Sequence, residues 1–410
     1  MDDHDHRILG PRLDLFHQQE EAPGMAFWHP RGATIYRLIE NYIRREMSRA
    51  GFQEVRTPQL LARSLWDRSG HLGKFGANMF VFSDGERSFA LKPMNCPGHV
   101  QLFRQQIRSY RDLPVRFSEF GACHRYELSG ALHGLMRGRV FTQDDAHVFC
   151  LHEHVEAEVQ HFCRLLRRVY ARFGFEDLLV GFSTRPVARE GTDATWDEAE
   201  ATLAAAARGA GLEFRHQPGE GAFYGPKLEF ILKDQDGREW QCGTMQLDLV
   251  IPERLDAEVV DASGARVRPV MLHQAVLGSI ERFMAILLEH HRGQLPFWLA
   301  PEQIVVAPVS ADQSEYARAV AATFNAADLR CVVDDADETL SRRIVSAHDK
   351  GIPFFVTVGP KEVSSGTVTI RERGGRQLVR SLREATDWLR DCDHSEEGAC
   401  PLSDSKFVVP

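Results

Sequence analysis

An arginine and a glutamate two residues apart stand in the stretch richest in residues that could do chemistry. The stretch runs from Arg116 to His147, and within it Arg125 and Glu127 are spaced to share one face of a strand. A guanidinium on that face holds phosphate oxygens, and a neighbouring carboxylate accepts from an amine, so the pair suits a nucleotide. An isolated pair of this kind is more often a surface salt bridge.

Two other segments leave similar alternatives open. Cys96 and His99 flank a Pro-Gly pair, which fits metal ligands or, by spacing alone, more readily a tight turn. The glycines around Tyr224 would let the backbone approach a ligand closely, and Tyr224, Gln241 and Gln246 would then line a polar pocket. The alternative is a hairpin on which these side chains have no role in binding.

A fourth segment combines Gly278 with Arg282 at the start of a predicted helix. The glycine would let the helix lie close to a sheet, with Arg282 directed at a nucleotide. A lone arginine in such a position is more often a solvated surface residue.

Composition describes an ordinary globular chain of 410 residues, with 43% hydrophobic and 26% charged residues and a net charge of -9. The acidic total does not favour RNA as a partner, so an RNA-related function must rest on local sites. No apolar run reaches the roughly 18 to 20 residues of a membrane span, and no export signal is visible. We therefore expect no membrane partner. Eight cysteines without a C-x-x-C pair predict free thiols and a cytoplasmic location.

The first three hundred residues predict an antiparallel sheet with amphipathic helices. A helix over 33–50 carries an apolar stripe and ends at Gly51, and residues 52–58 are extended. Residues 79–91 and 227–251 predict hairpins, and strands joined by short turns pair antiparallel. The chain contains neither G-x-G-x-x-G nor G-x-x-x-x-G-K-[ST], so a nucleotide site here is neither a Rossmann nor a P-loop site.

The remainder predicts a small α/β domain. Apolar runs at 304–308, 330–333 and 354–359 alternate with helices over 314–328 and 338–349, which gives three parallel strands. A hairpin through Gly366 and a helix over 382–389 follow. The expected organisation is an α+β chain with domains at 1–298 and 302–392 and a mobile tail at 393–410.

In order and together, these segments resemble threonyl-tRNA synthetases, which are class II aminoacyl-tRNA synthetases. Residues 51–58 look like the dimer-forming first motif, residues 120–145 like the second motif and residues 278–283 like the third. The runs MNCPGH at 94–99 and QDDAH at 143–147 are distinctive of the threonine enzymes. The resemblance implies a class II catalytic domain, an anticodon-binding domain, a homodimer, and threonine, ATP and tRNA(Thr) as substrates.

The resemblance also implies a zinc ion held by Cys96, His147 and His273, a set that no local spacing rule would find. One thiolate and two imidazoles leave coordination positions open, which is typical of a functional zinc site. In the family the amino and hydroxyl groups of threonine fill these positions. Valine lacks the hydroxyl and is therefore rejected.

The roles of the ATP-binding residues carry over in the same way. The resemblance implies that Arg125 binds the threonine carboxylate and the α-phosphate, that Arg137 and Arg282 bind the outer phosphates, and that Glu127 binds the adenine amine. Gln143 resembles a residue near the carboxylate and α-phosphate, and magnesium accompanies ATP. Arg125, Arg282 and Gln143 are thereby the expected catalytic residues.

The threonine side of the site is implied to consist of three further residues. Asp145 and Tyr224 are expected to contact the amino group and form the pocket wall, with Gln246 nearby. His99, His124 and His133 are expected to be structural or supporting residues.

Several features depart from the family pattern. Residues 137–141 read RGRVF where the family usually reads RVRGF, Gln274 replaces a common arginine, and residues 334–338 are unusually acidic. The chain also begins at the catalytic domain, so we expect no N-terminal or editing domain and measurable seryl-tRNA formation. The alternatives are a paralogue, such as a resistance copy or an enzyme that activates threonine for another acceptor, and, less favoured, a non-catalytic regulator that binds tRNA.

Overall fold

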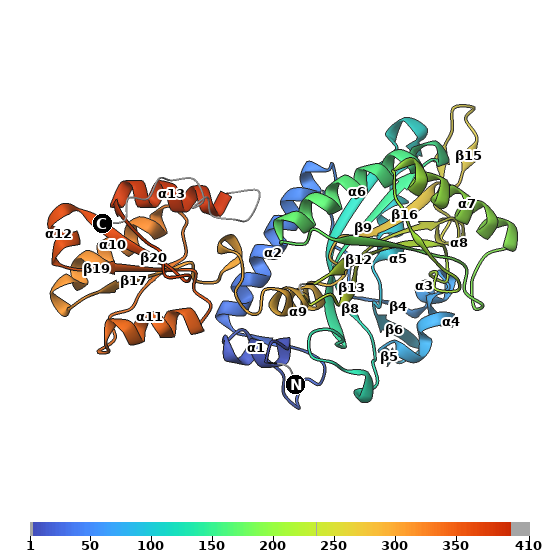
Figure 1. Ribbon diagram of the computed structural model, residues 1–410. Coiled ribbons are helices and arrows are strands. Elements are labelled where there is room, and N and C mark those ends of the chain that lie inside the picture. Colours follow the sequence, from blue (N-terminus) through green and yellow to red (C-terminus); the bar gives the residue numbers. More distant parts are fainter. Residues whose placement is uncertain (1–2, 235, 395–410) are drawn as a thin grey trace.

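The computed structural model describes residues 3–234 and 236–394 and arranges them in two lobes, each built on its own sheet (Figure 1). An eight-stranded sheet forms the larger lobe. In spatial order its strands are β11 (Arg215–Gln217), β10 (Leu178–Ser183), β12 (Lys227–Lys233), β13 (Glu239–Asp248), β16 (Val270–Ala275), β9 (Val140–Cys150), β8 (Val115–His124) and β3 (Gln53–Glu54). The predicted antiparallel pairing is confirmed, with parallel pairs at the two edges, β10 with β11 and β3 with β8.

Four helices pack against one face of this sheet because each carries an apolar stripe. They are α2 (Pro30–Arg49), α6 (Val155–Arg172), α7 (Asp193–Gly209) and α9 (Ile280–His290). Helix α2 is the helix predicted at 33–50, lengthened to Pro30 because proline fits the first helical turn. Gly51 follows it with φ +79°, as predicted for a residue that terminates a helix.

Side chains alternate between the two faces of the sheet, and this alternation exposes one face for function. Ala146 and Val148 of β9 pack with the four helices, whereas His147 between them and Phe149 point to the opposite face. On that opposite face lie helix α5 (Cys96–Phe103) and helix α8 (Ile251–Arg254).

Smaller elements surround the sheet. The predicted hairpin at 79–91 is confirmed as β5 (Val81–Asp84) and β6 (Arg87–Leu91), with Gly85 at φ +58° in its turn. The other short elements are α1 (His6–Arg12), β1 (Phe16–His17), β2 (Phe27–Trp28), β4 (Leu60–Ala62), α3 (Arg63–Arg68), α4 (His71–Phe75), β7 (Arg108–Ser109), β14 (Val259–Val260) and β15 (Arg266–Val267).

The smaller lobe confirms the predicted β-α-β-α-β order. Its sheet runs β18 (Cys331–Val333), β17 (Ile304–Pro308), β19 (Phe354–Val358), β20 (Thr367–Glu372) and β21 (Gln377–Ser381), and the first three strands are parallel. Its helices are α10 (Ser314–Ala326), α11 (Leu340–Asp349), α12 (Pro360–Ser365) and α13 (Leu382–His394). The prediction of a hairpin through Gly366 is wrong. Gly366 ends α12 at φ +64°, and the hairpin that follows joins β20 to β21.

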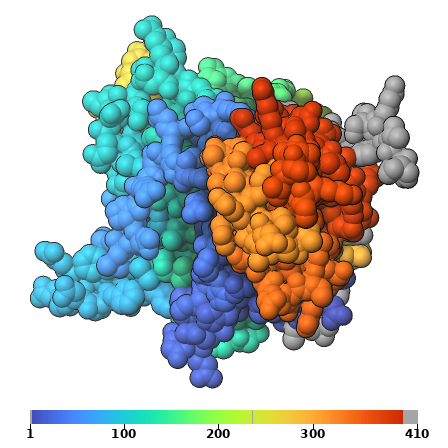
Figure 2. All heavy atoms as spheres, turned by 90° about the vertical axis from the view of Figure 1, so that its left-hand side faces the viewer, coloured from blue at the N-terminus to red at the C-terminus, as the bar shows by residue number. Residues whose placement is uncertain are grey.

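The two lobes touch through the N-terminal part of the chain, which lies against the orange residues in Figure 2. The Nε of Arg31, on α2, lies 2.7 Å from Oε2 of Glu302, and its Nη2 donates to the carbonyl of Lys350 over 2.6 Å. Arg172 Nη2, on α6, donates to the carbonyl of Asp393, on α13, over 2.7 Å. The exact boundary between residues 298 and 302 stays a prediction.

Three other expectations are corrected or limited by the structure. Strand β13 ends at Asp248 and not at Ile251, because the Asp248 carboxylate accepts from the amides of Val250 and Ile251 and turns the chain. Six described cysteines are free thiols, but Cys392 is disulfide-bonded. Of the predicted tail, residues 393 and 394 belong to α13 and the rest lies outside the described residues.

No helix among the described residues combines the length and apolar character needed to cross a membrane.

Candidate active site

The register of three strands gathers several of the predicted site residues on one face of the large sheet. His273 of β16 lies directly opposite His147 of β9 and opposite Gln246 of β13. Cross-strand partners point to the same side of a sheet, and so do residues at intervals of two along a strand. Gln143 and Asp145 therefore share the face of His147, and the three distant segments meet there.

Cys96, His147 and His273 form a buried cluster on this face. Their ligand atoms all lie within 4.8 Å of one another. Cys96 begins α5 and is fully buried, and the two histidines are 1% and 3% exposed. The Tyr224 ring stacks on the His273 ring at 4.5 Å and closes one side of the cluster.

Hydrogen bonds to groups outside the cluster determine which ring nitrogen of each histidine carries the proton and which has a free lone pair. His273 Nε2 lies 2.9 Å from the Asp248 carboxylate, so that nitrogen carries the proton. His99 Nε2 lies 3.1 Å from the Glu119 carboxylate, which leaves His99 Nδ1 bare to accept from His147 Nδ1 over 2.8 Å. By this network, His147 Nε2 and His273 Nδ1 both lack a proton, and they face each other at 2.9 Å.

Two lone pairs at this distance repel each other unless a cation lies between them, so the geometry fits a metal ion. Burial, with the charges of Asp145 and Asp248, raises the pKa of the Cys96 thiol, and burial lowers that of His147 well below its usual value. A cation would offset the cost of ionising this thiol. A thiolate with two neutral imidazoles is a donor set that zinc prefers.

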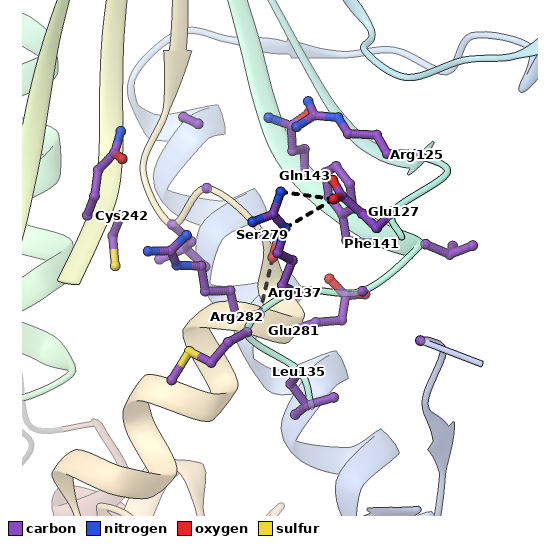
Figure 3. A pocket seen from close by; sticks show the side chains of 18 of the residues that line it. Arg125, Glu127, Leu135, Arg137, Phe141, Gln143, Cys242, Ser279, Glu281 and Arg282 are labelled. Atoms are coloured by element: carbon purple, nitrogen blue, oxygen red, sulfur yellow. Dashed lines mark hydrogen bonds and ion pairs between the residues drawn. The ribbon is translucent and has the colours of Figure 1, made fainter. Parts of the chain in front are cut away.

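A pocket of about 430 Å³ lies beside the cluster (Figure 3). Its volume is sufficient for a small-molecule substrate. The predicted site residues that line it are Arg125, Glu127, Arg137, Gln143, Gln246 and Arg282. The Tyr224 hydroxyl donates to Gln246 Oε1, so Tyr224 and Gln246 connect the pocket to His273.

Arg125 is held by two aromatic rings at the edge of the pocket. Its guanidinium carbon lies 5.0 Å from the Phe141 ring centroid and 5.5 Å from that of Phe75, and its Nε donates to the carbonyl of Pro93 over 3.2 Å. Cation–π contacts with two rings restrict a side chain that is otherwise flexible. The guanidinium is thereby presented to the pocket in one orientation.

The prediction that Arg125 and Glu127 lie on a strand is wrong. Strand β8 ends at His124. The Arg125 amide still donates to Arg139, but the Glu127 amide donates to the Arg125 carbonyl, which turns the chain away from the sheet. Both side chains nevertheless line the same pocket.

Arg282 enters the pocket from the first turn of α9 (Figure 3). Gly278 precedes the helix at φ +87°, and a Cβ there would lie 2.9 Å from the carbonyl oxygen of Cys242, so only glycine permits this approach. The Asp144 carboxylate fixes the turn by accepting from three successive amides, the last that of Gly278. Arg282 Nε is buried without a hydrogen-bond partner in the described chain, as expected of a group awaiting an anion.

Arg137 and Glu127 bind each other. Arg137 Nη2 lies 2.9 Å from Glu127 Oε2, and its Nε lies 3.1 Å from the same oxygen. The Arg137 side chain is 59% exposed. Both groups assigned to ATP by the resemblance are therefore engaged with one another in this structure (Figure 3).

Asp145 lies next to the buried cluster. Its Oδ1 is 3.8 Å from His147 Nε2, and its Oδ2 accepts from Nδ2 of the Asn95 side chain over 2.9 Å. A carboxylate in this position suits a substrate ammonium group beside the metal ligands. Tyr224, Gln246 and Asp145 thus all lie next to the two histidines of the cluster.

Of the residues that orient the two histidines, the sequence analysis names only His99, as a supporting residue, and it assigns no role to the carboxylates and the lysine of the network. Asp248 holds His273, Glu119 holds His99, and Lys92 Nζ lies 2.9 Å from Glu119 Oε1. The strand pattern could have pointed to Glu119. Buried and partly exposed residues alternate along β8, and Glu119 follows Phe117 by two residues, at a buried position. A buried carboxylate needs partners, which identifies it as part of a polar network.

Each of the two lobes matches the model of a known domain family. Residues 80–291 match the tRNA synthetase class II core domain (G, H, P, S and T), and residues 303–391 match an anticodon binding domain. The chain therefore belongs to the class II tRNA synthetases. A solved structure described as the RNA binding domain of threonyl-tRNA synthetase from Cryptosporidium parvum superposes with a TM-score of 0.89, at 38% identity, over 95% of this chain and 98% of that one. Within its class the chain belongs to the threonyl-tRNA synthetase family.

Curated relatives support the same assignment. Threonine–tRNA ligases of Rhodospirillum rubrum and Caulobacter vibrioides are 53% and 54% identical over 93% and 94% of this chain. The chain spans 59% of the length of each of these relatives. A prolyl-tRNA synthetase of Giardia lamblia, at 18% identity and a TM-score of 0.72, shares the fold.

Proposed function

We propose that this chain is a threonine–tRNA ligase that activates threonine with ATP and transfers it to tRNA(Thr). The observation that carries the proposal is the Cys96–His147–His273 cluster joined, through Tyr224 and Gln246, to a pocket lined by three arginines. Family membership supports the same activity. The anticodon-binding lobe supplies a means of contacting tRNA.

The cluster would hold a zinc ion. Bound there, zinc would supply a Lewis acid with open positions for the amino and hydroxyl groups of the substrate. The chain's own residues complete the selection: Asp145 accepts from the ammonium group, and Tyr224 and Gln246 form the wall. An amino acid without a β-hydroxyl leaves the site incomplete and is rejected, whereas serine loses only the contact of one methyl group.

The arginine pocket would bind ATP with its magnesium. Arg125, fixed between two rings, holds the threonine carboxylate near the α-phosphate, and Arg282 with Arg137 binds the outer phosphates. Glu127 accepts from the adenine amine once Arg137 releases it. Gln143 lines the same pocket and shares a face of β9 with Asp145, on the amino-acid side of the site.

The reaction would then proceed in two displacements. A carboxylate oxygen of threonine attacks the α-phosphorus, the bond to the leaving oxygen breaks, and pyrophosphate departs with its magnesium. A hydroxyl of the terminal ribose of tRNA then attacks the carbonyl carbon of the threonyl-adenylate and releases AMP. Arg125 and Arg282 act by position and charge and form no covalent bond in either step.

A homodimer in the cytoplasm completes the proposal, and family membership supports it. A paralogue that passes threonine to another acceptor is the second candidate. The acidic run 334–338 favours it, because Asp335, Asp337 and Glu338 are exposed on the smaller lobe and would disfavour an RNA backbone there. Arg318 and Arg342 lie 3.2 and 3.9 Å from Asp335 and Glu338 and offset part of this charge.

Two assays test these proposals with the purified chain. Threonine-dependent exchange of pyrophosphate into ATP is expected, and its absence would reject the enzyme in favour of a regulator. Charging of tRNA(Thr), compared with transcripts altered in the anticodon, separates the two enzymes. Exchange without charging would support the paralogue.

A further inference from the structure

A second group of titratable side chains lies outside the site described above. Asp5, His6 and Glu289 place ligand atoms within 4.8 Å of one another, as a metal site would. However, Asp5 caps α1 and binds Arg7, with Oδ2 2.6 Å from Arg7 Nη2. Both carboxylates already have cationic partners, since Arg238 Nη1 lies 2.9 Å from Glu289 Oε2. The group is a hydrogen-bonded network, and its centre is His6.

Both nitrogens of the fully buried His6 ring are used. The amide of Leu135 donates to Nε2 over 3.1 Å, and an amide can only donate, so Nε2 is bare. The proton therefore lies on Nδ1, which donates to Glu289 Oε1 over 2.7 Å. The His6 ring thus joins the backbone at residue 135 to the side chain at residue 289.

The loop on one side of His6 carries Arg137. Gly134 has φ +51°, and a Cβ there would overlap His6 Nε2, so the loop lies directly on the ring. The loop is tight, because His133 and Arg137 exchange backbone hydrogen bonds of 3.1 and 3.3 Å. Fixing the amide of Leu135 therefore fixes the backbone of Arg137, and both residues line the pocket.

The helix on the other side carries Arg282. Glu289 is 5% exposed and follows Arg282 on α9 by seven residues, which is two turns and brings both to one side of the helix. Burial opposes ionisation of Glu289, but the hydrogen bonds from His6 and the charge of Arg238 lower its pKa below the usual value. The carboxylate therefore stays charged and holds His6 firmly.

We propose that His6 is a positioning residue for ATP: its ring ties the loop of Arg137 to the helix of Arg282 and so sets the separation of the two arginines across the pocket. The inference rests on the proposed ATP-dependent activation. Its distinctive consequence concerns one substrate, because threonine binds among Asp145, Tyr224 and the metal-binding cluster, none of which touches His6 in the described chain.

Three substitutions separate the two hydrogen bonds. His6→Phe removes both, His6→Asn keeps a donor near Nδ1, and His6→Gln keeps an acceptor near Nε2. Loss of the Leu135 bond is expected to raise the KM for ATP in pyrophosphate exchange about 5- to 15-fold in the Phe and Asn variants, as one lost hydrogen bond implies. The KM for threonine should stay within about twofold, and the Gln variant should stay near wild type on this scale.

A matched control separates positioning from stability. Leu203→Ala, in the core on α7, is expected to lower the melting temperature without a selective change in the KM for ATP. An unchanged KM for ATP in His6→Asn, or equal rises for ATP and threonine, would overturn the proposal.

Hydrogen exchange at the Leu135 amide provides a readout that needs no activity. It should accelerate in His6→Asn and stay protected in His6→Gln, and equal protection in both would overturn the proposal. If wild type lacks exchange of pyrophosphate, the proposed function fails, and the amide measurement still decides whether His6 fixes the loop.

Discussion

The Cys96–His147–His273 cluster and the arginine pocket adjoin, yet they differ in how their side chains are held. Cys96, His147 and His273 are at most 3% exposed, and the outer nitrogens of both histidines are bonded to buried groups. In the pocket, Arg137 is 59% exposed and Arg282 Nε has no partner in the described chain. The side chains of the first region are already held by other groups of the chain, whereas in the second Arg137 would have to release Glu127 for the proposed binding of ATP.

In the proposed function, the cluster selects the amino acid and the arginine pocket accelerates its reaction with ATP. Rigid ligands whose tautomers are fixed discriminate by geometry, which suits the choice of an amino acid. Long arginines that exchange one anionic partner for another suit a nucleotide whose charge shifts during the reaction. Substitutions in the cluster should therefore affect metal retention and amino-acid choice, whereas substitutions in the pocket should affect the kinetics with ATP.

The largest effect is expected from the cluster. Cys96→Ala removes the only thiolate of the set and should abolish zinc retention, with a loss of threonine-dependent exchange on the order of 1,000-fold or more, equivalent to about 4 kcal/mol. Metal content by mass spectrometry and the exchange rate measure this. Cys163→Ala, which also removes a buried thiol, is the control and should keep its zinc. Full zinc occupancy and activity in Cys96→Ala would contradict the assignment.

A smaller effect is expected from the pocket. Arg282→Ala should lower kcat/KM for ATP roughly 100- to 1,000-fold through lost stabilisation of phosphate charge, while zinc content stays at wild-type level. Steady-state exchange kinetics at varied ATP test this. The exposed Arg167, on α6, gives a control in Arg167→Ala, which should leave the kinetics unchanged. A change below threefold in Arg282→Ala would remove this arginine from the ATP site.

The smallest effect concerns stability and pH. Burial alone would raise the pKa of Glu119, but hydrogen bonds from His99 and Thr57 and the charge of Lys92 lower it to about 2. A depressed pKa stabilises the fold above the unfolded value of about 4.5, and this contribution is lost as pH falls towards 2.

Glu119→Gln should therefore lower the free energy of unfolding at pH 7 by about 2 kcal/mol, with a smaller difference at pH 3.5. Denaturant unfolding at the two pH values measures it. A difference that grows on acidification would have the opposite sign and would contradict a stabilising, ionised Glu119.

The sequence was sufficient for much of the fold. Residues at intervals of three and four located α2, and the Asp-Gly turn located the hairpin β5–β6. The β-α-β-α-β order of the smaller lobe also followed from local patterns. These features depend on neighbours in sequence, which is why they could be predicted. Gly366 was misplaced because a glycine at positive φ serves a helix end as well as a hairpin.

The site could be predicted only through resemblance. His147 and His273 are 126 residues apart and meet because β16 inserts between β13 and β9, an order that no local pattern encodes. Resemblance supplied the three proposed ligands, but it did not supply Asp248 or Glu119, whose hydrogen bonds fix the tautomers of His273 and His99. Nor did it supply His6, whose partners at 135 and 289 become neighbours only in the folded chain.

The most direct test of the metal-centred selection is amino-acid-dependent pyrophosphate exchange by this chain, measured with threonine, serine and valine at known zinc content. We expect the highest kcat/KM for threonine, a value about 10- to 150-fold lower for serine, which lacks one methyl group, and no exchange above background for valine. Removal of zinc by a chelator should abolish exchange with every amino acid. Valine activated as well as serine, or full threonine exchange by the zinc-free protein, would contradict the claim that a metal-bound hydroxyl selects the substrate.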